Sequence, residues 1–339
     1  MKSEYQKYLE RRSEADNAFG KAATQALLEY VKSLPPNLRS HILNSVAHSF
    51  NIDKVVARIG DCEYEGFLAD KDVFWHAVST QHWSKELIDI FLRFFSNAKE
   101  GTYIDFGANI GLTTIPICKS GVRHCIAVEA APQNFQLLQR NLLRNGIDNC
   151  SPINVAISNS NASIDLELSE RNFGDHRIHL PDGRPPNHVE LYDETSRRTV
   201  TVRAARCDDL LKDTELTRPL AIKSDMQGAE VFLFSDGGDV LSRCDMLVSE
   251  YWPYGIARLG YATEYLHGQL KKHFPYGHVV SYGRNSNEDI WHPGTRLLPI
   301  EALVQLLQNQ FSSVDDKTAT AAERTRHANI ILAKSPIPI

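Results

Sequence analysis

The sequence lacks several features that would assign it to a particular class of protein. It has no Cys-x-x-Cys pair, and its six cysteines are scattered along the chain. Such cysteines are typical of buried thiols in a reducing compartment. The first 16 residues are polar and have no apolar core of a secretory signal. No apolar run reaches the roughly 18 residues that a membrane-spanning helix needs. We therefore expect a cytoplasmic protein with no membrane partner.

An excess of basic charge is also missing. The chain has 37 Lys and Arg residues against 42 Asp and Glu residues, and its formal net charge is −5. This balance gives no general attraction to nucleic acid, so we expect no nucleic-acid partner. The most basic stretch contains Arg197, Arg198, Arg203 and Arg206, a pattern that is typical of a solvated surface.

The length of 339 residues suits one α/β domain with additions. Residues 1–83 are predicted to form a mostly helical N-terminal extension, because a helix-like apolar face at residues 22–31 ends at a pair of prolines. Residues 84–339 are predicted to form the main domain. A polar insertion interrupts this domain at about residues 158–206 and contains the irregular segment 181–186.

Short apolar runs alternate with helix-like segments through the main domain. The helix-like segments begin after Ser84 and cover residues 112–118, 132–146 and 300–308. The runs that predict strands begin at Tyr103 and cover residues 125–128, 153–157, 220–224, 246–249, 278–282 and 328–333. This alternation predicts an α/β fold whose mainly parallel sheet has helices on both faces, with the last strand antiparallel to its neighbour.

The most informative segment is residues 103–111, where an apolar strand runs into a Gly-rich turn before a helix. This arrangement brings backbone N–H groups and a helix N-terminus to a nucleotide. Asp105 stands near the place where a dinucleotide fingerprint has its first glycine, close to a pyrophosphate. A carboxylate there would repel phosphates. The turn therefore suits a nucleoside with a cationic end and no phosphate, such as S-adenosylmethionine.

Glu129 follows the second predicted strand, 24 positions after Asp105. An acidic residue at about this distance from a Gly-rich turn can accept both hydroxyl groups of a ribose. The alternative is that Gly107 and Gly111 serve only a tight strand-to-helix turn and that Glu129 contacts no ligand.

A second group of candidates surrounds the fourth predicted strand. Lys223 and Asp225 lie two positions apart and therefore point to one side of the strand. Asp225 falls at the carboxyl end, where open α/β sheets place their ligands. Glu230 and Glu250 bring two further acids to strand ends. Such acids can bind a cation, orient a hydroxyl group or remove its proton. The alternative is a buried Lys–Asp pair beside the next helix.

The histidines give a weaker indication. His176 and His179 lack the three or four ligands of a metal site, and so does the stretch at residues 76–82. We therefore expect no metal. His176 lies in the polar insertion and is a candidate base on the acceptor side, with a surface-loop residue as the alternative.

In their order and spacing, these motifs resemble the FkbM-type methyltransferases. Residues 105–111 are similar to the family motif D-x-G-A-N-x-G, and residues 222–230 are similar to I-K-x-D-x-E-G-x-E. Three further segments match in the same order: residues 129–146, 154–158 and 172–174. The resemblance covers about residues 84–252.

The resemblance implies a class-I methyltransferase fold with a seven-stranded sheet and S-adenosylmethionine as the cofactor. It implies O-methylation of a hydroxyl on a carbohydrate or secondary metabolite, so the partner is a small-molecule or glycan acceptor. The sequence leaves open whether the protein forms a homo-oligomer. The candidate catalytic residues are Asp225, Lys223 and His176. The candidate cofactor-binding residues are Asp105, Phe106, Gly107, Ala108, Asn109, Gly111, Glu129, Ala130, Asn134, Ala156, Ile157 and Asp225.

The sequence departs from the family pattern at two positions. Gln227 stands where the family has Glu, and Ser224 replaces an apolar residue. The missing carboxylate weakens the case for a metal at this segment. It also keeps open an interaction module that binds S-adenosylmethionine without turnover, and N-methylation is a further alternative. A nicotinamide dehydrogenase conflicts with Asp105.

Overall fold

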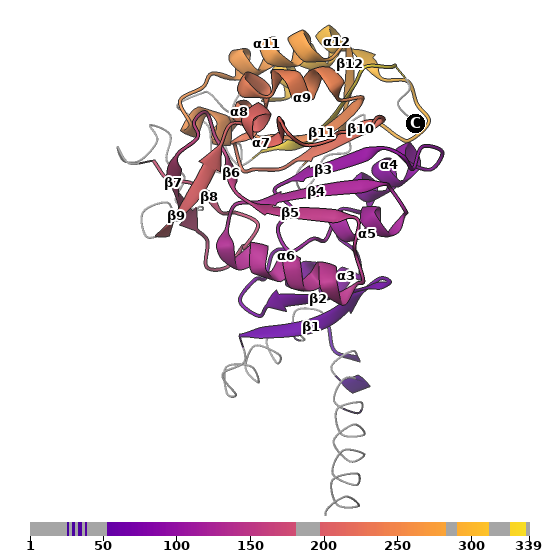
Figure 1. Ribbon diagram of the computed structural model, residues 1–339, viewed down its shortest axis with the longest axis vertical. Helices are drawn as coiled ribbons and strands as arrows, with labels where there is room; N and C mark the ends of the chain where they lie inside the picture. The colour runs from indigo at the N-terminus through magenta and orange to yellow at the C-terminus, as the bar shows by residue number, and fades with distance from the viewer. Residues whose placement is uncertain are drawn as a thin grey trace, which may run out of the picture. The chain divides into compact units, whose positions relative to one another are not determined.

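The computed structural model describes residues 53–180, 197–282, 290–311 and 326–336, together with a few single residues before position 53 (Figure 1). Contacts divide the chain into two units, residues 1–55 and residues 56–339. Most of the predicted helix at residues 22–31 lies outside the described residues, and so does the predicted irregular segment 181–186.

The described part of residues 1–83 is not mostly helical. It contains a two-stranded hairpin, β1 (Lys54–Ile59) and β2 (Cys62–Phe67), followed by one short helix, α3 (Phe74–Thr80). Burial alternates along β2, as expected when successive side chains point to opposite faces of a strand. The turn between the two strands contains Gly60 at a φ of +56°. Residues 56–83 belong to the same unit as the main sheet, so the contacts do not divide the chain at residue 83. The domain boundary at this residue stays a prediction.

The main sheet lies at the centre of the second unit (Figure 1). Its order is β13-β12-β14-β11-β10-β3-β4-β5. The strands are β3 (Thr102–Phe106), β4 (His124–Glu129), β5 (Cys150–Asn154), β10 (Leu220–Ser224), β11 (Met246–Tyr251), β12 (Tyr276–Tyr282), β13 (Leu298–Pro299) and β14 (Ala328–Ala333). The neighbouring strands β11, β10, β3, β4 and β5 are parallel to one another. Strand β14 is antiparallel to both of its neighbours, as predicted. The sheet has eight strands rather than the seven expected, because it includes the two-residue edge strand β13.

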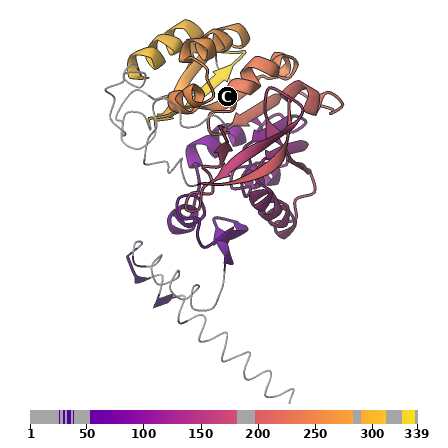
Figure 2. The same cartoon turned by 90° about the vertical axis from the view of Figure 1, so that its left-hand side faces the viewer.

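Helices cover both faces of this sheet, as predicted. They are α4 (Lys85–Phe94), α5 (Thr114–Lys119), α6 (Pro132–Arg144), α7 (Cys207–Leu211), α8 (Glu230–Asp236), α9 (Gly238–Arg243), α10 (Pro253–Arg258), α11 (Thr263–His273) and α12 (Ile300–Phe311). On one face Tyr103 and Cys125 share an apolar cluster with Phe91 of α4. On the other face Ile104 and Ile126 share a cluster with side chains of α8, α9, α11 and α12. Figure 2 shows α11 and α12, in orange and yellow, at the end of the unit that holds β14.

A second, smaller sheet occupies the predicted polar insertion. Its order is β6-β9-β7-β8, with β6 (Ala156–Ile157), β7 (Ser163–Leu168), β8 (Arg177–Ile178) and β9 (Arg198–Ala205). The predicted third strand at residues 153–157 is therefore divided between two sheets. The Asn154 side chain donates to the carbonyl oxygens of Glu129 and Ala130 at the point where β5 ends. Ala156 then pairs with Ala204 of β9.

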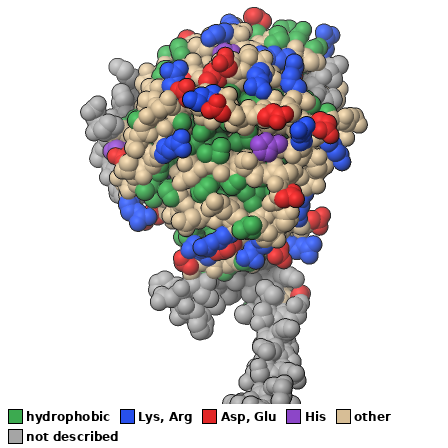
Figure 3. All heavy atoms as spheres, viewed as in Figure 1, with side chains coloured by type: hydrophobic (Ala, Val, Ile, Leu, Met, Phe, Trp, Pro, Cys, Tyr) green, Lys and Arg blue, Asp and Glu red, His purple; other side chains and the backbone are tan. Residues whose placement is uncertain are grey.

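The surface carries both signs of charge. Basic and acidic side chains are interspersed with hydrophobic ones over the face shown in Figure 3, which agrees with the small net charge. Arg197 differs from the solvated residue that the sequence predicts. Its side chain is 6% exposed, and its guanidinium lies 2.6 Å from the Asp175 carboxylate. All six cysteines lie within the described ranges and have free thiols. Among the described residues, no helix combines the length and the apolar character needed to cross a membrane.

Candidate active site

A cavity opens at the carboxyl ends of β3, β4 and β10. Strand β3 pairs with β4, the next strand of this sheet along the chain, on one side and with β10, a later strand, on the other side. Open α/β sheets bind their ligands at such a change of direction. The empty space is about 870 Å³ with its open mouth included. Most of the residues that the sequence proposes as site residues line this cavity.

The loop after β3 forms the floor of the cavity. Gly107 and Ala108 both donate their N–H groups to the carbonyl oxygen of Val128 in β4. Gly107 has a φ of +78°, and a Cβ atom there would lie 1.8 Å from the backbone oxygen of Asp225. Only glycine fits this approach, because the loops that follow β3 and β10 touch here. Gly107, Ala108 and Asn109 line the cavity, as proposed.

Asp105 lies beneath this loop and does not line the cavity. Its side chain is 0% exposed, and its Oδ1 atom accepts from Lys223 Nζ at 3.0 Å. Its Oδ2 atom accepts from the hydroxyl groups of Thr113 and Thr114, both at 2.7 Å. The expectation that Asp105 repels phosphates is therefore not supported, because a buried ammonium compensates its charge. Asp105 instead supports the loop from below.

Two other proposed cofactor residues also lie outside the cavity lining. Phe106 is fully buried in the apolar core. Gly111 has a φ of +92°, and a Cβ atom there would meet Leu138 at 3.0 Å and Ile115 at 3.1 Å. Both residues shape the turn and the packing of the elements around it, and any contact with a ligand stays a prediction.

Glu129 ends β4 and lines the cavity. Its Oε2 atom accepts from the N–H group of Asn109 and its Oε1 atom from that of Ala131, both at 2.8 Å. Burial, partly opposed by these two donors, raises the pKa of Glu129 to about 7. A carboxylate offers about four acceptor sites, so the two backbone donors leave capacity for a ligand.

Two asparagines hold the opposite loop. The side-chain amides of Asn109 and Asn134 both donate to the carbonyl oxygen of Phe173, at 3.1 and 2.8 Å. Asn134 Oδ1 is buried and has no hydrogen-bond partner among the described residues. Since Asn134 lines the cavity, this unpaired oxygen is suited to accept a hydrogen bond from a ligand.

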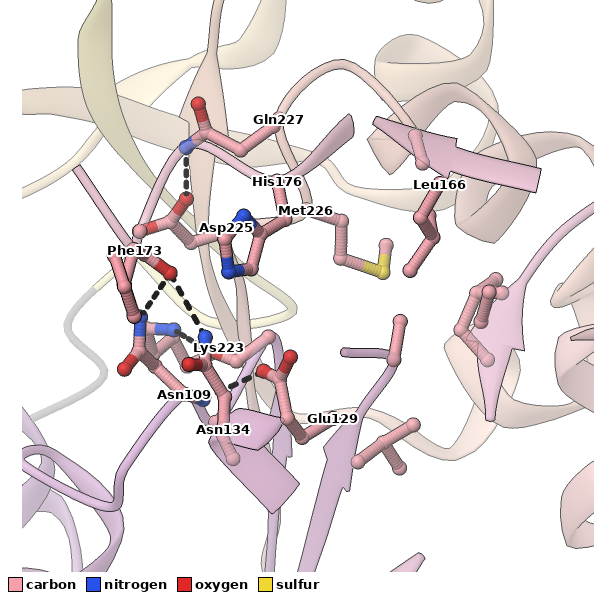
Figure 4. A pocket seen from close by; sticks show the side chains of 18 of the residues that line it. Asn109, Glu129, Asn134, Leu166, Phe173, His176, Lys223, Asp225, Met226 and Gln227 are labelled. Carbon is pink, nitrogen blue, oxygen red and sulfur yellow. Dashed lines mark hydrogen bonds between the residues drawn. The ribbon is translucent and has the colours of Figure 1, made fainter. Parts of the chain in front are cut away.

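One wall of the cavity is apolar. It includes the proposed residues Ala130, Ala156 and Ile157. Figure 4 shows Leu166 and Met226 on this side, while Asp225 and Gln227 lie on the other side of the view. A planar apolar ring fits such a wall better than a charged group does.

Three carboxylates converge beside the end of β10. Asp225, Glu230 and Glu250 each have an oxygen within 4.8 Å of the others. Glu230 accepts from the N–H groups of Met226 and Gly228, and burial raises its pKa to about 7. Burial, followed by the charges of Asp225 and Glu230, raises the pKa of Glu250 well above its ordinary value. The sequence predicts that these acids lie at strand ends but does not predict how close together they are.

His176 lines the cavity and is not a surface-loop residue. Its Nδ1 atom accepts from the N–H group of Ser169 at 3.1 Å. Burial, with the nearby charge of Arg197, lowers the pKa of His176 to about 3. The imidazole is therefore neutral at physiological pH. His179 lies apart from the cavity and pairs with Glu167 at 3.1 Å.

Part of the cavity wall precedes residue 84, in a segment that the sequence leaves open as a contributor to the acceptor site or to an oligomer contact but where it indicates no particular site residue. Val73 and Trp83 line the cavity. The Asp70 carboxylate accepts from the N–H groups of Val73 and Phe173, both at 3.2 Å, and so ties this segment to the loop that holds Phe173. The aromatic residues at positions 74–83 were the available signal, but they were assigned to an extension.

The strand order, the antiparallel β14 and the cavity at the carboxyl ends define an α/β fold of the class-I methyltransferase type. A family model described as the methyltransferase FkbM domain matches residues 105–277, just over half of the chain. The chain therefore belongs to the FkbM methyltransferase family, and S-adenosylmethionine is its expected methyl donor. The comparison with curated proteins finds no significant match.

Solved structures give only weak likenesses. M. jannaschii TYW2 in complex with AdoMet has 15% identity and a TM-score of 0.35, over 84% of this chain and 87% of that one. Pyrococcus abyssi Trm5b has 13% identity and a TM-score of 0.35, over 83% and 55%. A precorrin-6y C5,15-methyltransferase of Geobacter metallireducens has 12% identity and a TM-score of 0.36, over 74% and 88%.

Proposed function

We propose that the protein transfers a methyl group from S-adenosylmethionine to a hydroxyl group of a carbohydrate or secondary metabolite. One observation carries the proposal. Glu129 and Asp225 enter a single cavity from the ends of β4 and β10, with the Gly107 loop between their strands. Glu129 can therefore accept hydrogen bonds from the ribose of a bound cofactor, while Asp225 faces the acceptor in the same cavity.

The residues of the cavity fit the cofactor. Glu129 retains acceptor capacity for the ribose hydroxyls, and Asn134 Oδ1 is an unpaired buried acceptor. The Gly107 loop is suited to the methionine part, and the wall with Ala156 and Ile157 is suited to the adenine ring. Bound there, S-adenosylmethionine supplies a methyl group that is already activated on a sulfonium.

The chain's own task is then to align the acceptor and remove its proton. Alignment of reacting atoms at about 3–3.5 Å provides much of the rate enhancement, and a positioned base adds about 10²–10⁴-fold. We assign the base to Asp225, which lines the cavity at the end of β10. His176 is a weak base because its pKa lies near 3. Lys223 donates to Asp105 and to the Gly107 carbonyl, and we assign it to support of the loop.

The remaining lining residues support a carbohydrate-like acceptor. Trp83 and Phe173 present aromatic surface, whereas Asp225 and Gln227 present groups that hydrogen-bond to hydroxyls. A sugar ring offers apolar faces and hydroxyl edges, so it matches both kinds of surface. An amine is the second candidate acceptor, because the carboxylates of Asp225, Glu230 and Glu250 would attract an ammonium group.

The test is incubation of the protein with cell extracts and S-adenosylmethionine carrying an isotopically labelled methyl group. Mass spectrometry of the products identifies the acceptor, and fragmentation or NMR shows which atom carries the label. We expect a labelled methyl ether. A labelled amine would move the assignment to N-methylation. Tight binding of S-adenosylhomocysteine without any labelled product would instead favour a binding module.

A further inference from the structure

The turn after β10 has an unusual backbone. Gln227 has a φ of +56°, a left-handed conformation that non-glycine residues adopt uncommonly. Gly228 follows at a φ of +99°, and a Cβ atom there would lie 2.6 Å from the backbone carbonyl of Gly255 in α10. The close approach of α10 thus restricts the turn, and the turn directs the Gln227 side chain back toward Asp225 (Figure 4). Backbone strain of this kind often accompanies a functional position.

The Gln227 amide lies between two carboxylates. Its Nε2 atom donates to Asp225 Oδ1 at 2.9 Å and reaches Glu250 Oε2 at 3.5 Å. The reversed amide would place Oε1 against both carboxylates, so the contacts define the orientation. The short bond fixes one oxygen of Asp225. The second contact brings the same donor to the carboxyl group of Glu250, a member of the same cluster.

We propose that Gln227 is a positioning residue for methyl transfer. Its amide holds the Asp225 carboxylate toward the acceptor, and the amide itself occupies the place that a bound cation would otherwise take. The proposal rests on the role given above to Asp225. It adds that the cluster works without a metal in this chain because an N–H₂ group points into it.

A carboxylate at position 227 would reverse this arrangement. Gln227→Glu has the same shape, but it removes the donor and adds a fourth acid to the three that converge here. Oxygen ligands from several carboxylates are what Mn²⁺ and Mg²⁺ prefer. The substitution should therefore create a site that needs a cation, which a merely structural role for Gln227 does not predict.

The experiment compares Gln227→Glu with two other variants. Gln227→Asn keeps an amide and tolerates the left-handed backbone, but it is one methylene shorter and cannot reach both carboxylates. Gln305→Glu is the charge control, because Gln305 donates to Asn309 on an exposed part of α12. Melting temperature is measured with and without Mn²⁺, S-adenosylhomocysteine affinity by calorimetry, and kcat and KM with the acceptor that the labelling experiment identifies.

We expect Gln227→Glu to melt at least about 3 °C lower than the unaltered protein without Mn²⁺ and to regain this difference with about 1 mM Mn²⁺. Its transfer rate should fall at least about tenfold and recover in part with Mn²⁺, while S-adenosylhomocysteine affinity changes less than about threefold. Gln227→Asn should lose transfer without recovery by Mn²⁺. The unaltered protein and Gln305→Glu should not respond to Mn²⁺.

Two results would overturn the proposal. One is that Mn²⁺ stabilises the unaltered protein as much as Gln227→Glu. The other is that Gln227→Glu and Gln227→Asn both transfer methyl groups at the unaltered rate. Failure of the proposed function is a different result: the unaltered protein would then give no labelled product, while the response of the melting temperatures to Mn²⁺ would still test the amide of Gln227.

Discussion

Asp105 and Lys223 form a buried ion pair beneath the Gly107 loop. The two residues are register partners on β3 and β10, and Oδ1 and Nζ are 3.0 Å apart with side chains that are 0% and 6% exposed. Lys223 Nζ also donates to the Gly107 carbonyl at 3.0 Å. Burial alone would lower the pKa of Lys223, but the charges of Asp105 and Asp225 outweigh it and raise the pKa. The pair therefore joins two central strands to the floor of the cavity.

Removal of the ammonium from this pair should be costly. Lys223→Met leaves the Asp105 carboxylate buried without its counter-ion, and we expect a loss of about 3–5 kcal/mol in the free energy of unfolding. Lys85→Met is the matched control, because Lys85 pairs with Asp89 on the surface of α4. It should cost less than about 1 kcal/mol. Urea denaturation of both variants measures the difference, and equal losses would contradict the structural role of the pair.

A methyl group at position 107 should disturb the site more than one at another glycine of positive φ. Gly107→Ala combines a φ of +78° with a Cβ atom 1.8 Å from the Asp225 carbonyl oxygen. Gly146→Ala has a φ of +66° and no atom within 4 Å of its Cβ. We expect Gly146→Ala to lose about 1–2 kcal/mol of stability through backbone strain, and Gly107→Ala at least about 2 kcal/mol more. Similar unfolding midpoints for the two variants would contradict the close contact.

Glu129 should determine affinity for the nucleoside. Glu129→Gln removes the charge that accepts from Asn109 N and Ala131 N. We expect it to weaken S-adenosylhomocysteine binding about 10–100-fold in calorimetry, since a hydrogen bond to a charged group contributes about 1.5–3 kcal/mol. Glu86→Gln on the exposed part of α4 should leave the Kd unchanged. An unchanged Kd for Glu129→Gln would remove the ribose assignment.

The same residue should give the stability of the ligand-free protein a characteristic pH dependence. Burial raises the pKa of Glu129 from 4.5 to about 7. Between these values the folded state binds more protons at this site than the unfolded state does, so its contribution to stability falls as the pH rises. The free energy of unfolding of the unaltered protein, relative to Glu129→Gln, should fall by about 1–3 kcal/mol between pH 5 and pH 8. Urea titrations at four pH values check this, and a constant difference would contradict it.

Local sequence signals predicted much of the fold. Pro132 begins α6 and Asn145 caps it, as its Pro and Asn-Gly signals indicate. The strand at residues 328–333 was predicted with its bounds and its antiparallel pairing. The hairpin β1–β2 was missed because glutamates separate the apolar residues of β2, whereas the predicted strands are continuous apolar runs. The two-residue strands β6, β8 and β13 are too short to give any periodic signal.

The site was predicted less completely, for a physical reason. Glu129 and Asp225 could be proposed because strand ends in a parallel sheet meet at one edge. The direction of the Asp105 side chain could not be predicted, because it depends on Lys223, which is 118 positions away in the sequence. Trp83 could not be placed either, since its position depends on how α3 and the Phe173 loop are tied together through Asp70.

Methyl transfer by Asp225→Ala, compared with the unaltered protein, tests the central claim most directly. With the acceptor identified by labelling, single-turnover rates are measured alongside S-adenosylhomocysteine affinity. If Asp225 orients and deprotonates the acceptor, the rate falls about 100-fold or more, while the Kd for S-adenosylhomocysteine stays within about threefold and the melting temperature shows a folded protein. Equal rates for the two proteins would contradict the claim that the end of β10 is the transfer point.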